Sequence, residues 1–155
     1  MNGLGPVLAW LETMTVAGAV KNSLFLTASI SGAHLLGATL VGGGALVAGL
    51  RGARLLLTDL PLVEVVRPAT RVVLSGLAIS LLTGGTLFTT RATAAAANTV
   101  FQTKMAVLLI AVALQIVLFR RSREKGAGHG TLLVLAASLS CLGVLAAGAA
   151  FILLE

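Results

Sequence analysis

Four long apolar stretches alternate with short polar segments along this chain. They are Ser23–Leu50, Thr70–Thr90, Phe101–Phe119 and Thr131–Leu154. Each is long enough to cross about 30 Å of hydrocarbon, which takes roughly 20 helical residues. Lipid cannot hydrogen-bond exposed backbone groups, so each stretch is predicted to be a helix. The short linkers between them predict an all-α integral membrane protein, folded as one antiparallel four-helix bundle over residues 1–155.

Two shorter segments have the pattern of helices that lie at the membrane surface. Pro6–Val20 (PVLAWLETMTVAGAV) precedes the first apolar stretch. Its proline suits a first helical turn, and Trp10 suits the depth of the lipid headgroups. We therefore expect a short N-terminal interfacial helix there. Leu55–Val66 is expected to form a similar helix after the first apolar stretch.

Composition and charge agree with the apolar pattern. Hydrophobic residues make up 57% of the chain and charged residues only 10%, whereas a soluble domain carries about 25% charged residues. The net charge of +6 comes largely from two loops, which hold Arg51, Arg54, Arg67 and Arg71, and Arg120, Arg121, Arg123 and Lys125. Basic residues gathered between apolar stretches are typical of membrane topology and not of nucleic-acid binding. Membrane lipids are therefore the expected surroundings, and no nucleic-acid partner is expected.

The same basic residues predict the orientation of the chain. Cytoplasmic loops of membrane proteins carry an excess of lysine and arginine. Both basic loops are therefore expected in the cytoplasm, which places the N- and C-termini in the periplasm. The predicted location is the bacterial inner membrane, crossed several times.

His34 is the candidate site residue of the first apolar stretch, which contains no Asp, Glu, Lys or Arg. A polar ring at that depth is costly without a partner, so it marks a functional candidate. Ser31 and Gly37 share its helical face. One interpretation is that His34 hydrogen-bonds a neighbouring helix and the glycine permits close packing. The other is that His34 is an axial metal ligand, with Gly37 leaving room for a flat macrocycle.

Lys104 is the second candidate, about one turn inside the third apolar stretch. It either extends to the lipid interface or belongs to the same site as His34. Counting 1.5 Å per residue puts the two residues roughly 5 Å apart in depth. Met105 offers a thioether, and Gln115 lies on the helical stripe of Lys104.

The residues and motifs that several other functions require do not occur in this sequence. No Asp or Glu lies within the four apolar stretches, which argues against a carboxylate proton relay. No phosphate-binding GKS/T loop, HExxH or CxxC occurs, so nucleotide and zinc-hydrolase functions have no support. The one cysteine, Cys141, is expected to be an unreactive core residue.

Five segments carry a resemblance to known proteins: AWLE, SGAHLLGATLVGG, LRGARLL, SGLAISLLTGGTLF and NTVFQTKMAVLLIAVAL. Together they resemble a bacterial family of four-helix membrane proteins over nearly the whole chain. The same plan is more distantly similar to the copper-resistance D (CopD) membrane domain and to the HemJ-type protoporphyrinogen oxidases. The latter are haem-b proteins that pair a first-helix histidine with a later-helix lysine, and His34 and Lys104 match that pair. The aromatic-rich first helix of the oxidases is missing, so the resemblance does not carry their enzymatic activity over.

The resemblance implies a haem b that supports electron transfer or redox chemistry. His34 would be its axial ligand, and Lys104 would lie beside a propionate or act as a distal partner. With one strong ligand in the chain, a bis-histidine site would require a homo-oligomer, and electron transfer would require a membrane redox partner. Two alternatives stay open: a structural or accessory membrane subunit without cofactor, and copper handling on the analogy to CopD.

Overall fold

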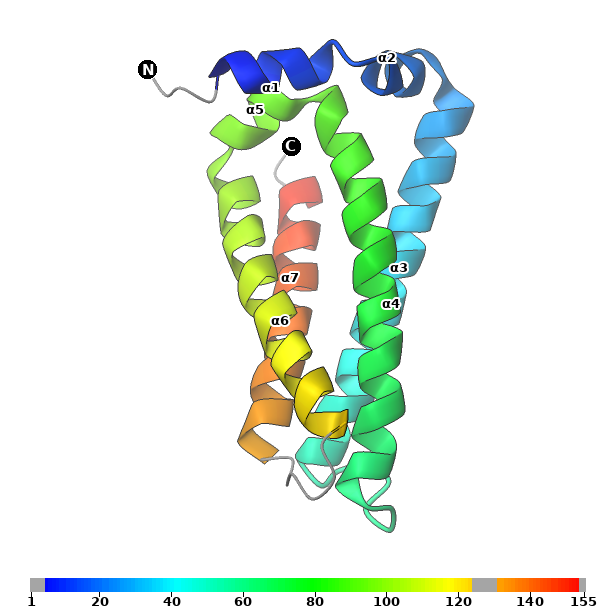
Figure 1. The fold of residues 1–155 in the computed structure, drawn as a ribbon, viewed down its shortest axis with the longest axis vertical. Helices are drawn as coiled ribbons and strands as arrows, with labels where there is room; N and C mark the ends of the chain where they lie inside the picture. The colour runs from blue at the N-terminus through cyan, green and yellow to red at the C-terminus, as the bar shows by residue number, and fades with distance from the viewer. Residues whose placement is uncertain (1–4, 124–130, 154–155) are drawn as a thin grey trace.

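All regular structure in the described part of the chain is helical (Figure 1). The computed structural model describes residues 5–123 and 131–153, and side chains within 5–120 and 133–146. Its long helices are α3 (Leu24–Gly52), α4 (Leu62–Thr90), α6 (Thr99–Arg123) and α7 (Thr131–Leu153). Its short helices are α1 (Gly5–Glu12), α2 (Thr15–Asn22) and α5 (Ala92–Ala97). The prediction of an all-α chain is confirmed.

Three of the long helices are long and apolar enough to cross a membrane: α3, α4 and residues Thr99–Arg120 of α6. Within α7, the described stretch Leu133–Ala146 is apolar but shorter. Large apolar side chains project from the spans, among them Leu24 (87% exposed) and Phe25 (80% exposed). Such surfaces suit contact with lipid tails, so the structure agrees with a multi-pass membrane protein. Leu154, the expected end of the fourth stretch, lies outside the described residues.

The loop between α3 and α4 differs from the prediction. A separate helix over Leu55–Val66 was expected, but residues 54–61 form no helix and α4 begins at Leu62, eight residues before Thr70. Two residues in this loop, Arg54 and Leu57, have positive φ angles, which no helix can contain. The Arg51 side chain donates two hydrogen bonds to the Leu60 carbonyl, at 3.2 and 2.7 Å, and so fixes the loop.

The N-terminal segment also differs in detail. One interfacial helix over Pro6–Val20 was expected, and the structure instead has α1 and α2, which are separated at Thr13 and Met14. The Thr13 hydroxyl donates to the Trp10 carbonyl at 2.7 Å, which replaces a helical hydrogen bond where α1 ends. Figure 1 shows α1 and α2 crossing one end of the long helices, beside α5. We call this the α1/α5 end, and the opposite end, with Arg51, Arg54 and Arg67, the arginine end.

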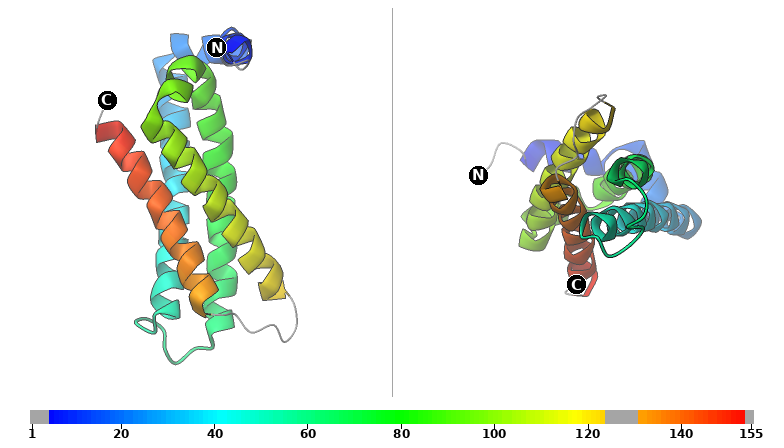
Figure 2. Two further views of the ribbon diagram at one scale, coloured as in Figure 1. Left: turned by 90° about the vertical axis from the view of Figure 1, so that its left-hand side faces the viewer. Right: turned by 90° about the horizontal axis from the view of Figure 1, so that it is seen from below.

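The long helices pack through small residues. Contacts join α3 to α4 and to α7, and α6 to α4 and to α7. Figure 2 shows α6 and α7 tilted relative to α3 and α4. Gly37 of α3 and Gly76 of α4 lie close together, since a methyl group built on Gly76 would lie 2.6 Å from the Gly37 carbonyl oxygen. Close backbone contact of this kind is a main source of helix association in lipid.

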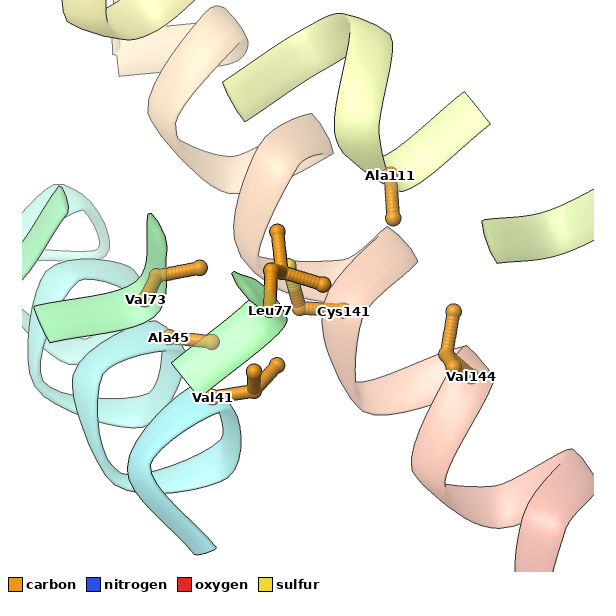
Figure 3. Packing of buried hydrophobic residues seen from close by; sticks show 7 residues of the cluster. All are labelled: Val41, Ala45, Val73, Leu77, Ala111, Cys141 and Val144. Atoms are coloured by element: carbon orange, nitrogen blue, oxygen red, sulfur yellow. The ribbon is translucent and has the colours of Figure 1, made fainter. Parts of the chain in front are cut away.

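Two apolar clusters form the described core. The middle cluster draws on all four long helices and comprises Val41, Ala45, Val73, Leu77, Ala111, Cys141 and Val144 (Figure 3). The arginine-end cluster comprises Ala48, Val66, Ala69, Leu118, Val134 and Ala137. Cys141 is buried and free, as a core residue should be.

Candidate functional site

The ring of His34 is held by a threonine of the neighbouring helix. Its Nδ1 lies 3.0 Å from the Thr83 hydroxyl oxygen on α4. That hydroxyl donates its only proton to the Ile79 carbonyl, at 2.7 Å. With that proton on Ile79, the Thr83 oxygen accepts from Nδ1, and this arrangement corresponds to the tautomer with the imidazole proton on Nδ1. The other ring nitrogen, Nε2, then carries a lone pair.

Gly84 gives the imidazole its space on α4. A methyl group built on Gly84 would lie 2.9 Å from Cε1 of His34 and 3.3 Å from Nδ1. Any larger residue would displace the ring from its hydrogen bond. Thr83 and Gly84 are successive residues, so one turn of α4 both orients the ring and makes room for it.

Lys104 of α6 lies within electrostatic range of the same ring. It is half-buried, and its ammonium group interacts electrostatically with His34. No Asp or Glu occurs in the sequence between Glu64 and Glu124. The lysine therefore has no carboxylate in α6 itself, nor in α4 beyond Glu64 near its arginine end, with which to form an ion pair. A buried cation without such a partner is costly, and this favours an anionic ligand beside it.

The site lies outside the well-packed core. In the described part of the chain, buried residues of α3 begin at Gly37, those of α4 end at Leu77, and those of α6 begin at Ala111. His34, Thr83 and Lys104 all lie beyond these limits, toward the α1/α5 end. The side chains of the three spans are half-buried or exposed there. This half of the molecule therefore keeps accessible side chains, as a site for a large ligand requires.

The space beside Gly37 is occupied by the neighbouring helix, as the close-packing interpretation expects. The axial-ligand interpretation expected Gly37 to leave room for a flat macrocycle, but a methyl group built on it would lie 2.5 Å from the Ser80 hydroxyl oxygen and 2.9 Å from the Gly76 carbonyl oxygen. The space beside Gly37 is filled by α4, because both helices carry small residues at that level.

Gln115 does not join the His34 site either. It is buried (2% exposed) and donates to the Ala137 carbonyl and to Cys141 Sγ, both at 3.4 Å. Eleven residues separate it from Lys104, about 16 Å along the helix. The two residues share a stripe of α6, as the spacing indicated, but at different depths.

Ser31 and Met105 remain near the site by position. Ser31 lies one turn before His34, and Met105 follows Lys104; both are half-buried. Thr83 and Gly84 were not among the site residues predicted from the sequence, so their role at the His34 ring was missed. The available signal was the pair Thr83-Gly84 in a span that can reach the depth of His34.

The protein ligands that the site offers are few. No group of three or more His, Cys, Asp or Glu residues that could hold a metal ion occurs among the described residues. A cofactor held here would need one axial bond from His34 and further contacts of other kinds. Comparison with family models, curated proteins and solved structures gives no match for this chain.

Proposed function

We propose that this chain is a haem-b-binding protein of the bacterial inner membrane, with His34 as an axial ligand. In this proposal α7 also crosses the membrane, so that α3, α4, α6 and α7 form an antiparallel four-helix bundle. The arginine end faces the cytoplasm and both termini face the periplasm, in keeping with the positive-inside rule. The resemblance of His34 and Lys104 to the histidine–lysine pair of the HemJ-type oxidases supports the choice of cofactor.

The observation that carries the proposal is the hydrogen bond between His34 Nδ1 and Thr83. A metal-binding histidine normally donates its other ring N–H to a neighbouring acceptor, which fixes the tautomer and the ring orientation. Thr83 is that acceptor, because its own proton is engaged by Ile79. Nε2 is left as a neutral nitrogen donor, as an axial iron bond requires.

Lys104 is proposed to bind a haem propionate. An ammonium–carboxylate contact is charge-assisted and is stronger where water is scarce. The absence of acidic residues from the neighbouring sequence leaves this charge for a ligand. A distal position for Lys104 or Met105 on the metal is the other arrangement that the proposal contains.

The residues present fit one axial bond and one propionate contact. When bound, haem b supplies one-electron redox chemistry. This chain would hold the group in place and fix the ring of His34. A second strong protein ligand would have to come from a second copy of the chain, which would make the site bis-histidine. Electron transfer would then proceed to a membrane redox partner.

The deciding experiment is an absorption spectrum of the purified protein. We expect a Soret band and stoichiometric iron when the chain is expressed with ample haem and purified in mild detergent. His34→Ala should abolish the band while the protein still inserts, whereas the control His129→Ala, which changes the other histidine of the chain, should keep it.

A second pair of variants tests the hydrogen bond itself. Thr83→Val removes the acceptor of His34 Nδ1 and should weaken haem binding by about 10- to 100-fold, the usual effect of losing such a partner. Thr86→Val is the matched control, since the Thr86 hydroxyl bonds only the Leu82 carbonyl one turn further on.

Other outcomes would support the alternatives. Protein without a Soret band that binds stoichiometric copper through His34 would indicate copper handling. Protein with neither haem nor metal would indicate a structural or accessory subunit, in which His34 and Thr83 only join α3 to α4.

A further inference from the structure

A layer of polar side chains interrupts the apolar core near the arginine end. Gln115 of α6 hydrogen-bonds Ala137 of the arginine-end cluster and Cys141 of the middle cluster, so it lies at their junction. Thr70 of α4 follows Ala69 of the arginine-end cluster and precedes Val73 of the middle cluster.

The last and first of the four long helices, α7 and α3, complete this layer with small groups. Ser138 follows Ala137 on α7 and faces Gly49 of α3, where a methyl group would lie 3.4 Å from the Ser138 hydroxyl oxygen. We call Thr70, Gln115 and Ser138 the polar layer. At a rise of about 1.5 Å per residue along α3, Gly49 lies about 22 Å from His34. The polar layer is therefore separate from the candidate haem site.

The polar atoms of this layer are deeply buried and lack protein partners. Thr70 is 1% exposed, and Gln115 and Ser138 are each 2% exposed. The Thr70 hydroxyl, the Gln115 Oε1 and the Ser138 hydroxyl have no hydrogen-bond partner among the described residues. Buried polar groups in proteins are almost always hydrogen-bonded, to protein atoms or to ordered water. Three such atoms between the same two clusters therefore indicate a small polar ligand.

We propose that the polar layer is a binding site for ordered water inside the bundle. Gln115 Oε1 can only accept a hydrogen bond, while the two hydroxyls can both donate and accept. Water matches this set, because it supplies two donors and two acceptors, and internal waters typically make about three hydrogen bonds.

A monovalent cation fits the layer less well than water. All three groups are neutral, and no Asp or Glu lies in the sequence between Glu64 and Glu124 to balance a buried charge. A cation would therefore be desolvated without compensation. Val66, Leu118 and Val134 of the arginine-end cluster are essentially fully buried beside the layer. They separate the water site from the aqueous phase at the arginine end.

Cys141 provides a reporter for this water. Its sulfur lies 3.4 Å from Gln115 Nε2 and the residue is fully buried. A short, intense X-ray pulse generates hydroxyl radicals from water, including ordered internal water, and these oxidise adjacent side chains. With the full chain in lipid nanodiscs, we expect Cys141 to be oxidised by the pulse although a membrane-impermeant maleimide does not modify it. In O₂-free buffer one hydroxyl radical takes the thiol hydrogen and a second adds its oxygen to the sulfur, so exchange into H₂¹⁸O should place ¹⁸O in the oxidised thiol.

The layer variants decide between water and a dry core. Gln115→Leu should reduce the oxidation of Cys141 severalfold. Thr70→Val should do the same, and because it keeps the side-chain volume it still provides the test if Gln115→Leu fails to fold. Thr39→Val is the control, because it removes an exposed hydroxyl that bonds Leu35 outside the layer, and it should leave the oxidation unchanged.

Two results would overturn the proposal. One is wild-type Cys141 that resists the pulse as fully as it resists maleimide. The other is oxidation that stays at the wild-type level in both layer variants.

Discussion

The imidazole of His34 packs directly against the α-carbon of Gly84, on the helix that also supplies its hydrogen-bond partner. A methyl group built on Gly84 would lie 2.9 Å from Cε1 of the ring, closer than carbon atoms can approach. A methyl group built on the next residue, Gly85, would have no neighbouring atom within 4 Å. Two adjacent glycines of α4 thus differ completely in what a single methyl group would meet.

This difference predicts opposite results for two neighbouring substitutions. Gly84→Ala should push the His34 ring away from Thr83 and, on the proposed function, lower haem occupancy and shift the Soret band. Gly85→Ala should leave the absorption spectrum and the yield unchanged, because its methyl group enters open space. The measurement is the ratio of Soret to protein absorbance, with insertion checked by yield in detergent. Equal spectra for the two variants would place the ring elsewhere.

The contact between α3 and α4 predicts a graded response to added methyl groups. Gly37→Ala meets the Ser80 hydroxyl at 2.5 Å and the backbone of Gly76 at 2.9 Å, so the two helices must separate. We expect a loss of stability of about 1–3 kcal/mol, the usual cost of overpacking. Gly49→Ala should cost less, since it meets the Ser138 Cβ at 3.1 Å.

The control for this series is Gly43→Ala, which meets nothing within 4 Å. Thermal unfolding in detergent should rank the midpoints as Gly43→Ala, then Gly49→Ala, then Gly37→Ala, from highest to lowest. A midpoint for Gly37→Ala at the level of Gly43→Ala would contradict the close approach of α3 and α4.

The length and apolar character of the spans could be predicted from the sequence, because a helix in lipid depends on local composition. The partner of His34 could not be predicted in the same way. It depends on the register of α4 against α3, and that register is set by the contact of Gly37 with Gly76. The predicted start of α4 was also wrong. The arginines near Thr70 suggested a segment at the membrane surface and not the first turns of a span. Arg67 and Arg71 are exposed, so α4 includes both without burying their charge.

The contact between α1 and α5 predicts a dependence on pH. Glu12 Oε1 accepts hydrogen bonds from the Thr93 hydroxyl at 2.7 Å and from the Thr93 backbone N–H at 2.8 Å. The side-chain bond, and then the backbone bond, hold the pKa of the Glu12 carboxyl below its usual value. A lowered folded-state pKa means that this contact stabilises the protein above the usual pKa of the carboxyl. The contribution is lost as the pH falls through the lowered value.

Trp10 measures this change, because it is the one tryptophan of the chain and lies in α1. Acidification should increase the quenching of Trp10 fluorescence by acrylamide as α1 leaves α5. Glu12→Gln should remove the acid transition, whereas Glu64→Gln, at the arginine end, should keep it. A wild-type transition that survives in Glu12→Gln would assign it to another group.

The proposed orientation predicts which residues a membrane-impermeant thiol reagent can reach. Eight basic residues lie in two short stretches of the sequence, 51–71 and 120–125. In a Cys141→Ala background, Ala94→Cys in α5 should react in whole cells with an opened outer membrane. Asp59→Cys, in the loop before α4, should react only after the inner membrane is broken. Both positions are exposed, so accessibility within the protein is matched. Reaction of Asp59→Cys in whole cells would reverse the topology.

The two roles left to Lys104 in the haem proposal separate by spectrum and by rescue. As a propionate partner, Lys104 contributes charge. Lys104→Ala should then lower haem occupancy with little change in the position of the Soret band. Lys104→Arg should restore occupancy, because a guanidinium also pairs with a carboxylate. As an axial ligand, it contributes a nitrogen lone pair: both variants would shift the band, since arginine stays protonated and cannot bind the metal. Its half-buried position beside His34, without an acidic residue in its span, favours the first outcome. Lys21→Ala is the control, because it removes an exposed lysine near the α1/α5 end and should affect neither quantity. A shifted band in Lys104→Arg would therefore assign Lys104 to the metal and exclude the propionate contact.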